Sequence, residues 1–219
     1  NLLLNFDRGG GTDVEDSSTI GGTGHKVTAT ADAKIKSSPF GDGKSSIYFA
    51  GSDDYLVLAA SAHLFPDEGN WTFDCWIHCW GGGDVLGGAF RILLEGGKLK
   101  FVGGGLDTFL ESSAGGWVGG SEAVTEWTHL AVVCNSGIIT AYKNGIARNI
   151  PLTRASSIGA DDQAHGIGAQ NTGGNDYTGH MDEIRYVQGE AIWTSNFTPS
   201  QYRYGHASAT HEATTSSNV

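Results

Sequence analysis

Residues 71–80 carry the strongest structural signal of the chain, and they read Trp71-Thr72-Phe73-Asp74-Cys75-Trp76-Ile77-His78-Cys79-Trp80. In an extended strand, successive side chains point to opposite faces. One face then holds Trp71, Phe73, Cys75, Ile77 and Cys79, and the other holds Thr72, Asp74, Trp76 and His78. This alternation predicts a β-strand that is buried on its apolar side.

Further short segments rich in aromatic and β-branched residues lie between turns of Gly, Asn, Asp and Ser, and each predicts a strand. They are residues 2–6, 46–49, 55–58, 91–94, 98–102, 128–134, 138–143, 146–150 and 179–187. Asn144-Gly145 fits a type I′ hairpin turn, because both residues accept positive φ. Helical periodicity is almost absent. Many short strands without helices predict an all-β fold, a sandwich of two antiparallel sheets.

Composition and charge limit the number of domains and the classes of partner that the chain can be expected to bind. The chain has 219 residues, 34 of them glycine, and its net charge is 13 − 24 = −11. A surface this acidic repels phosphate groups, so neither nucleic acid nor an anionic membrane is expected as a partner. No apolar run approaches the ~18 residues of a membrane span. The polar stretch 203–219 predicts a flexible tail after one domain that spans residues 1–202.

The three cysteines, Cys75, Cys79 and Cys134, do not form a disulfide framework. Cys75 and Cys79 share a strand face but lie roughly 13 Å apart along it, at about 3.3 Å per residue. His78 points to the other face, so a zinc site that joins it to the two cysteines is excluded by geometry. The cysteines are therefore predicted to be small buried apolar side chains.

Seven segments occur in an order that matches a known family. They are residues 3–7, 45–56, 71–77, 127–133, 141–145, 179–185 and 194–199. Together they resemble the laminin-G-like version of the concanavalin A-like jelly roll, which occurs in phage structural proteins and in secreted bacterial proteins. The resemblance implies two curved antiparallel sheets that bind ligands or partners through loops or the concave face, mostly without catalysis.

Some relatives with this fold are glycoside hydrolases that carry a Glu-x-Asp-x-x-Glu strand. Retaining hydrolysis needs two carboxyl groups about 5–5.5 Å apart, as residues i and i+2 of a strand can supply. The sequence lacks this arrangement, and the adjacent Asp182 and Glu183 are expected on opposite strand faces. An enzyme is therefore not predicted, and a hydrolase is the least favoured of three functional hypotheses.

The resemblance also implies one structural calcium ion that joins the first strand to the last. Its carboxylate ligands would be Asp7 and Asp182, with backbone carbonyls from residues 41–43 as neutral ligands. The alternative interpretation is that Asp7 caps a turn and that Asp182 accepts backbone hydrogen bonds at the end of a strand. No other cofactor is predicted.

Two loops are candidate glycan sites, because sugars bind flat aromatic faces flanked by polar groups. Trp117 lies in the glycine-rich segment 113–120, where a large aromatic side chain either anchors the loop or binds a ligand. A second polar and aromatic loop holds Asn171, Asn175, Asp176 and Tyr177. The other tryptophans considered are predicted to pack in the fold, namely Trp71, Trp76, Trp127 and Trp193.

The favoured hypothesis is a non-catalytic adhesion module that contacts surface glycans and is displayed in many copies on a phage virion or a cell surface. The alternative is a structural decoration protein of a virion that binds neighbouring proteins and no sugar. Both hypotheses place the chain on a virion surface or outside the cell. Unpaired cysteines favour assembly in a reducing cytoplasm, and hence a virion origin.

Overall fold

The computed structural model of the protein describes residues 1–7, 11–18, 24–38, 44–61, 64, 69–110, 126–148, 151–154, 156 and 163–200. Within these ranges the chain forms sixteen strands and no helix. The described part of the chain thus contains no helix that could cross a membrane. The predicted tail at 203–219 lies outside the described residues.

Nine strands form the first sheet, called sheet A: β1 (Leu2–Leu4), β3 (Lys34–Ser37), β4 (Ser45–Ala50), β6 (Trp71–Gly81), β11 (Thr128–Asn135), β12 (Ile138–Lys143), β13 (Ile146–Ala147), β14 (Leu152–Thr153) and β16 (Thr178–Gln188). Their order is β13-β12-β11-β6-β16-β4-β3, with β1 beside β16 and β14 beside β12. The long strands β6 and β16 therefore lie in the middle of sheet A.

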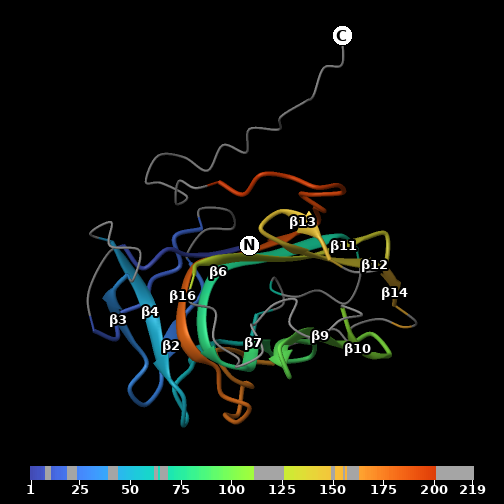
Figure 1. Ribbon diagram of the computed structural model, residues 1–219. Helices are drawn as coiled ribbons and strands as arrows, with labels where there is room; N and C mark the ends of the chain where they lie inside the picture. Colours follow the sequence, from blue (N-terminus) through green and yellow to red (C-terminus); the bar gives the residue numbers. More distant parts are fainter. Residues whose placement is uncertain are drawn as a thin grey trace.

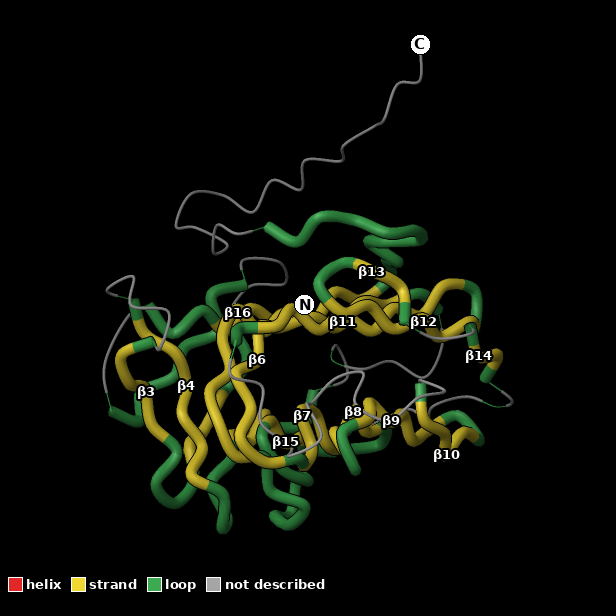
Figure 2. Tube along the Cα trace, in the orientation of Figure 1, coloured by secondary structure: helices red, strands yellow, loops and turns green. Residues whose placement is uncertain are grey.

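Seven strands form sheet B: β2 (Val27–Ala29), β5 (Leu56–Leu58), β7 (Gly83–Gly87), β8 (Arg91–Glu95), β9 (Lys98–Gly103), β10 (Leu106–Phe109) and β15 (His165–Ile167). Their order is β10-β9-β8-β7-β15-β5-β2, and every pairing in both sheets is antiparallel. Figure 1 shows β6 and β16 curving from the layer of β11 and β12 toward the layer of β7. The two facing layers are clearest in the Cα trace of Figure 2. The predicted all-β jelly-roll sandwich is confirmed.

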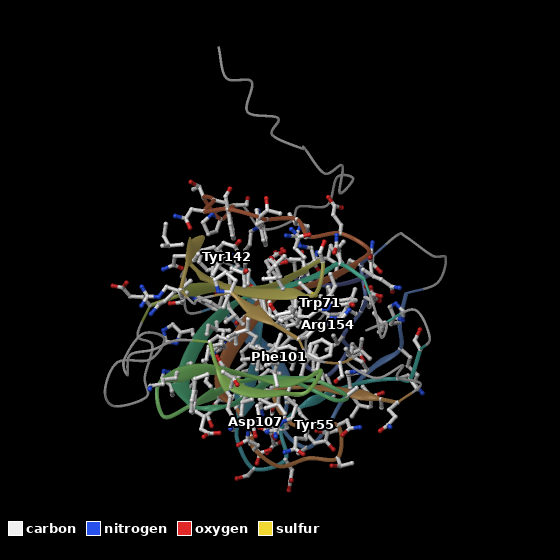
Figure 3. The ribbon with its side chains drawn as sticks, turned by 90° about the vertical axis from the view of Figure 1, so that its right-hand side faces the viewer. Tyr55, Trp71, Phe101, Asp107, Tyr142 and Arg154 are labelled. Atoms are coloured by element: carbon white, nitrogen blue, oxygen red, sulfur yellow. The ribbon has the colours of Figure 1, made fainter. Side chains whose placement is uncertain are left out.

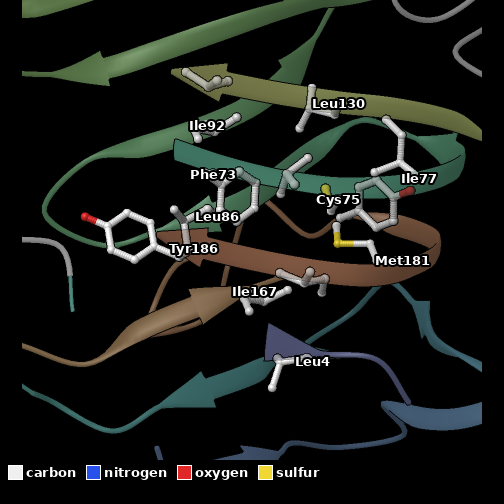
Figure 4. Close-up of a cluster of buried hydrophobic side chains, with 14 of the residues drawn as sticks. Leu4, Phe73, Cys75, Ile77, Leu86, Ile92, Leu130, Ile167, Met181 and Tyr186 are labelled. Atoms are coloured by element: carbon white, nitrogen blue, oxygen red, sulfur yellow. The ribbon is translucent and has the colours of Figure 1, made fainter. Parts of the chain in front are cut away.

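The core lies between the sheets, and the alternation of β6 supplies its centre. All five residues of the predicted apolar face are buried, namely Trp71, Phe73, Cys75, Ile77 and Cys79. Figure 4 shows Phe73, Cys75 and Ile77 in one layer with Met181 and Tyr186 of β16. The rings of Trp71 and Phe101 bridge the sheets, with centroids 6.2 Å apart (Figure 3). The three cysteines are free and buried, as predicted.

Six strands were not predicted from the sequence, namely β2, β3, β7, β10, β14 and β15. Two of them contain glycines that their packing requires. A Cβ on Gly83 would lie 2.4 Å from the backbone of Asp176, and one on Gly166 would lie 2.3 Å from the carbonyl oxygen of Ala169. The loop that follows β15 therefore packs directly on the backbone of sheet B. Glycine at such positions conceals the apolar alternation that identifies a strand.

Candidate functional site

In the described part of the chain, residues 189–200 cover the first half of the outward face of β6. The Thr72 hydroxyl makes two hydrogen bonds to this segment: Oγ1 donates to the carbonyl of Glu190 at 3.0 Å and accepts from the amide of Ile192 at 3.0 Å. The segment 189–200, called the covering segment, thus begins directly above β6. Its Trp193 and Phe197 stack with ring centroids 3.9 Å apart.

The covering segment forms a small second core on the outside of sheet A. Trp193 and Phe197 pack with Ala191 against Ala131, Val133 and Tyr142 of β11 and β12. Figure 3 shows Tyr142 on the side of sheet A that faces away from Phe101. The prediction that Trp193 packs in the fold is confirmed.

A buried ion pair lies beneath the covering segment. The Asp74 carboxylate is fully buried and accepts from Arg185 Nε at 2.8 Å, from Arg185 Nη2 at 3.2 Å and from His129 Nε2 at 3.2 Å. Burial alone raises the pKa of Asp74, but Arg185 and His129 outweigh burial and hold this pKa below its usual value. The guanidinium also lies 5.3 Å from the ring of Trp193. This half of the face is occupied by structural contacts.

The second half of the same face carries a group of outward rings, called the Trp80 cluster and defined as Tyr48, His78, Trp80, Trp127 and His180. Trp80 is 41% exposed and lies at the centre. Its ring centroid is 5.8 Å from that of Tyr48, 5.5 Å from His78 and 5.3 Å from His180, each edge to face. Trp127 closes the group, 5.8 Å from His78 and 6.4 Å from His180.

Strand register brings these residues together from distant parts of the sequence. His180 of β16 stands opposite His78 of β6 on one side and opposite Tyr48 of β4 on the other. A register shift next to Gly179 aligns the two histidines, and Gly179 has a φ of 145°. A Cβ there would lie 2.2 Å from the carbonyl oxygen of His78, so only glycine fits.

His180 is the buried anchor of the Trp80 cluster. It is only 6% exposed, and its Nδ1 lies 2.8 Å from the Ser46 hydroxyl. Burial, with smaller contributions from the nearby His78 and Lys36, lowers the pKa of His180 from 6.5 to about 4. The imidazole is therefore neutral at physiological pH, which keeps the base of the Trp80 cluster uncharged.

This perturbed histidine predicts a loss of stability in mild acid. The pKa of His180 is about 4 in the folded state and 6.5 without perturbation, so the unfolded state binds more protons between these values. Stability should therefore fall as the pH drops from 6.5 toward 4. We expect the urea midpoint of His180→Gln to change less over this range than that of the unmodified domain, with His25→Gln as the matched control. An NMR titration that places the pKa of His180 near 6.5 contradicts the prediction.

The predicted loop at 171–177 has a different place in the molecule. Asn175 donates from Nδ2 to the buried Asp84 carboxylate at 2.9 Å, and Arg91 holds that carboxylate with two bonds of 2.8 and 2.9 Å. Burial raises the pKa of Asp84, while Arg91 and Asn175 oppose this effect. Asn175 is exposed, whereas Asn171 and Asp176 are half-buried. Asn175 thus ties the loop to sheet B.

Tyr177 lies in the core instead of on the loop surface. Its side chain is fully buried, its hydroxyl donates to the carbonyl of His180 at 3.1 Å, and its ring packs edge to face on Phe49. A ligand at the protein surface does not reach this ring, so the expectation of a binding role is corrected to one in packing. Tyr177 supports the backbone of the Trp80 cluster from the inner side of sheet A.

Of the two predicted calcium ligands, Asp182 lies beside a bulge in β16. Asp182 is buried, and its Oδ1 accepts from the amide of Glu183 at 2.9 Å, while Lys44 Nζ is 3.8 Å from the Asp7 carboxylate. The bulge interrupts the strict alternation expected for Asp182 and Glu183, and both are buried. No group of three or more His, Cys, Asp or Glu side chains that could hold a metal occurs in the described part of the chain. Residues 41–43 lie outside it, and the calcium site stays a prediction.

Besides Trp71 and Trp193, the chain holds four tryptophans. Trp117 lies outside the described residues. Trp76 and Trp127, predicted to pack in the fold, are partly exposed and make ring contacts with His129 and His78 respectively. Trp80 was not singled out, although continuing the alternation of β6 by one residue places it on the outward face.

Comparison with solved structures shows the same fold at low sequence identity. The binding domain of Paraclostridial Mosquitocidal Protein 1 aligns with a TM-score of 0.61 and 13% identity, over 85% of this chain and 48% of that one. Domain 4 of AbnA, a GH43 extracellular arabinanase from Geobacillus stearothermophilus solved in complex with arabinotriose, aligns at 0.57 and 13%, over 85% and 93%. Botulinum neurotoxin type C, in a study of its interaction with two ganglioside molecules, aligns at 0.55 and 11%, over 85% and 47%.

The chain thus spans about half the length of the two toxin chains and nearly all of the arabinanase domain. No curated protein matches it. A family model described as the concanavalin A-like lectin/glucanases superfamily matches residues 50–201, which is well over half of the chain. With the sandwich described above, this match establishes that the chain belongs to the concanavalin A-like lectin/glucanases superfamily, in its laminin G branch.

Proposed function

We propose that this protein is a non-catalytic module that binds glycans on the Trp80 cluster. The observation that carries the proposal is the partly exposed Trp80 ring, which three neighbouring rings hold on the outside of sheet A. An aromatic ring presents a flat apolar face to the C–H surface of a sugar. Because edge-to-face contacts fix the ring before a ligand arrives, little conformational entropy is lost on binding.

The surroundings of Trp80 support binding without bond cleavage. The Trp80 cluster contains no carboxylate, and the nearby Asp182, which stands opposite Trp76, is buried. Glycoside hydrolysis generally needs two carboxyl groups that flank the scissile bond. A binding role is also in keeping with the structural neighbours, which include a toxin binding domain and an arabinanase domain solved with arabinotriose.

A site on an open sheet face binds one sugar weakly. An affinity near millimolar corresponds to a free energy of about −4 kcal/mol. Presentation in many copies adds avidity of about 10²–10⁴ without new contacts. We therefore propose that the module acts in multiple copies, on a virion or on a cell surface.

Truncation of the central ring tests the proposal. We expect a multimerised form of the domain to bind on a glycan array, and Trp80→Ala to weaken that binding at least ~10-fold, the loss typical of a central aromatic contact. Phe109→Ala is the matched control, because Phe109 is 38% exposed and lies on β10 of sheet B. Thermal unfolding of both variants checks that the fold is intact.

Two other outcomes would redirect the proposal. Equal binding by Trp80→Ala and the unmodified domain, with a loss in Trp117→Ala, would move the site to the 113–120 loop. Absence of binding to every glycan, together with stable association with neighbouring protein copies, would favour the structural alternative of a decoration protein.

A further inference from the structure

Two lysines border the Trp80 cluster on strand β3. Lys34 stands opposite Tyr48 and Lys36 opposite Ser46 across the β3–β4 pairing. Residues two apart on a strand share one face, so both side chains rise on the outward side of sheet A. Ser46 in turn contacts His180, which places Lys36 beside the base of the Trp80 cluster.

Neither lysine makes an ion pair within the described ranges, although the chain carries 24 carboxylate residues and a net charge of −11. Four other cations of the described residues are matched with acids: Arg91 with Asp84, Arg185 with Asp74, Lys100 with Asp107 and Lys44 with Asp7. Among the described residues, the positive charge beside the Trp80 cluster thus has no carboxylate in ion-pair contact, although the chain as a whole is acidic.

Lys36 is also held in place by an aromatic ring. Its Nζ lies 3.4 Å from the centroid of the Tyr48 ring, within the range of a cation–π contact. Tyr48 itself packs edge to face on Trp80. The ammonium group therefore lies at most about 9 Å from the centre of the exposed indole, because the Tyr48 ring contacts both of them.

We propose that the ligand of this face is an anionic saccharide, one that bears a carboxylate or a sulfate group. The apolar face of a sugar ring stacks on Trp80, and its acidic group pairs with Lys36 and Lys34. This inference rests on the proposed function and adds the charge of the ligand to it. A neutral sugar would use the aromatic ring alone and leave both ammonium groups without a partner.

The test compares matched probes that differ in one acidic group. Multivalent conjugates of a sialylated glycan and of the same glycan after removal of its sialic acid form one arm, and a sulfated and unsulfated pair form the other. We expect the domain to prefer at least one acidic probe by about tenfold, as a charge-assisted hydrogen bond supplies. The arm that shows the preference identifies the acidic group.

Removal of the lysine charges tests whether the preference for acidic probes comes from β3. Lys36→Gln should reduce the preference for the acidic probe, and Lys34→Gln combined with Lys36→Gln should abolish it, while Lys98→Gln should leave the preference unchanged. Lys98 is a matched control because it too lies over a ring, 5.3 Å from the centroid of Phe109. Equal binding of acidic and neutral probes, or an unchanged preference in Lys36→Gln, overturns the inference but keeps glycan binding. Absence of binding to any probe overturns both.

Discussion

Arg185→Met is expected to lower the free energy of unfolding by about 3–5 kcal/mol, the cost of removing one partner of a buried ion pair. Asp74 is fully buried, and Arg185 supplies two of its hydrogen bonds. Without the guanidinium, the buried Asp74 carboxylate loses two hydrogen bonds and their positive charge, so it must become protonated or admit water into the sheet. Urea unfolding at pH 7 measures this loss directly.

A double variant separates the pair from the packing around it. Asp74→Leu combined with Arg185→Met removes both charges, and we expect it to recover most of the stability, since apolar replacement of a buried pair is often neutral. Lys100→Met breaks the pair with Asp107 at the surface and should leave the urea midpoint nearly unchanged. A single variant Arg185→Met as stable as the unmodified domain would show that the buried ion pair between β6 and β16 does not stabilise the fold.

The fold was predictable because apolar side chains alternate regularly with outward-facing ones along its central strand, β6. The five apolar residues of residues 71–79 are all in the core, and the ten segments predicted from sequence all contain strands. The strands that escaped prediction are short or rich in glycine, as in β7 and β15, where the backbone of a neighbouring loop takes the place of side chains. Local patterns do not reveal this kind of close backbone approach.

The candidate site was less predictable than the fold, because it depends on the register between distant strands and on which side chains of β6 the covering segment buries. The sequence shows that Trp76 and His78 point away from the core, but it does not show that residues 189–200 meet the outward face of β6 near its start, at Thr72. Trp80, near the end of the strand, is 41% exposed. Nor does the sequence show that His180, one hundred residues further along the chain, stands opposite His78. Trp117 was favoured from its glycine-rich context alone.

Gly179→Ala is expected to destabilise the domain by about 2–6 kcal/mol, the sum of backbone strain and overpacking at about 1–3 kcal/mol each. Gly179 has a φ of 145°, which L-residues rarely adopt, and an added Cβ would lie 2.2 Å from the His78 carbonyl and 3.0 Å from Cys79 Cα. These atoms belong to the backbone of β6 and have little freedom to move. Thermal and urea unfolding give the size of the loss.

The same substitution links the fold to the proposed binding face. Relief of the clash requires β16 to shift against β6, and this shift separates His180 from His78 and disturbs the rings around Trp80. We therefore expect Gly179→Ala to lose glycan binding even at temperatures where it remains folded. Gly189→Ala is the control: it has a positive φ of 84° but nothing within 4 Å of the added Cβ, so it carries backbone strain without a clash. Equal stability and equal binding of the two variants would mean that the strand register does not depend on Gly179, and that the Trp80 cluster is held by its ring contacts alone.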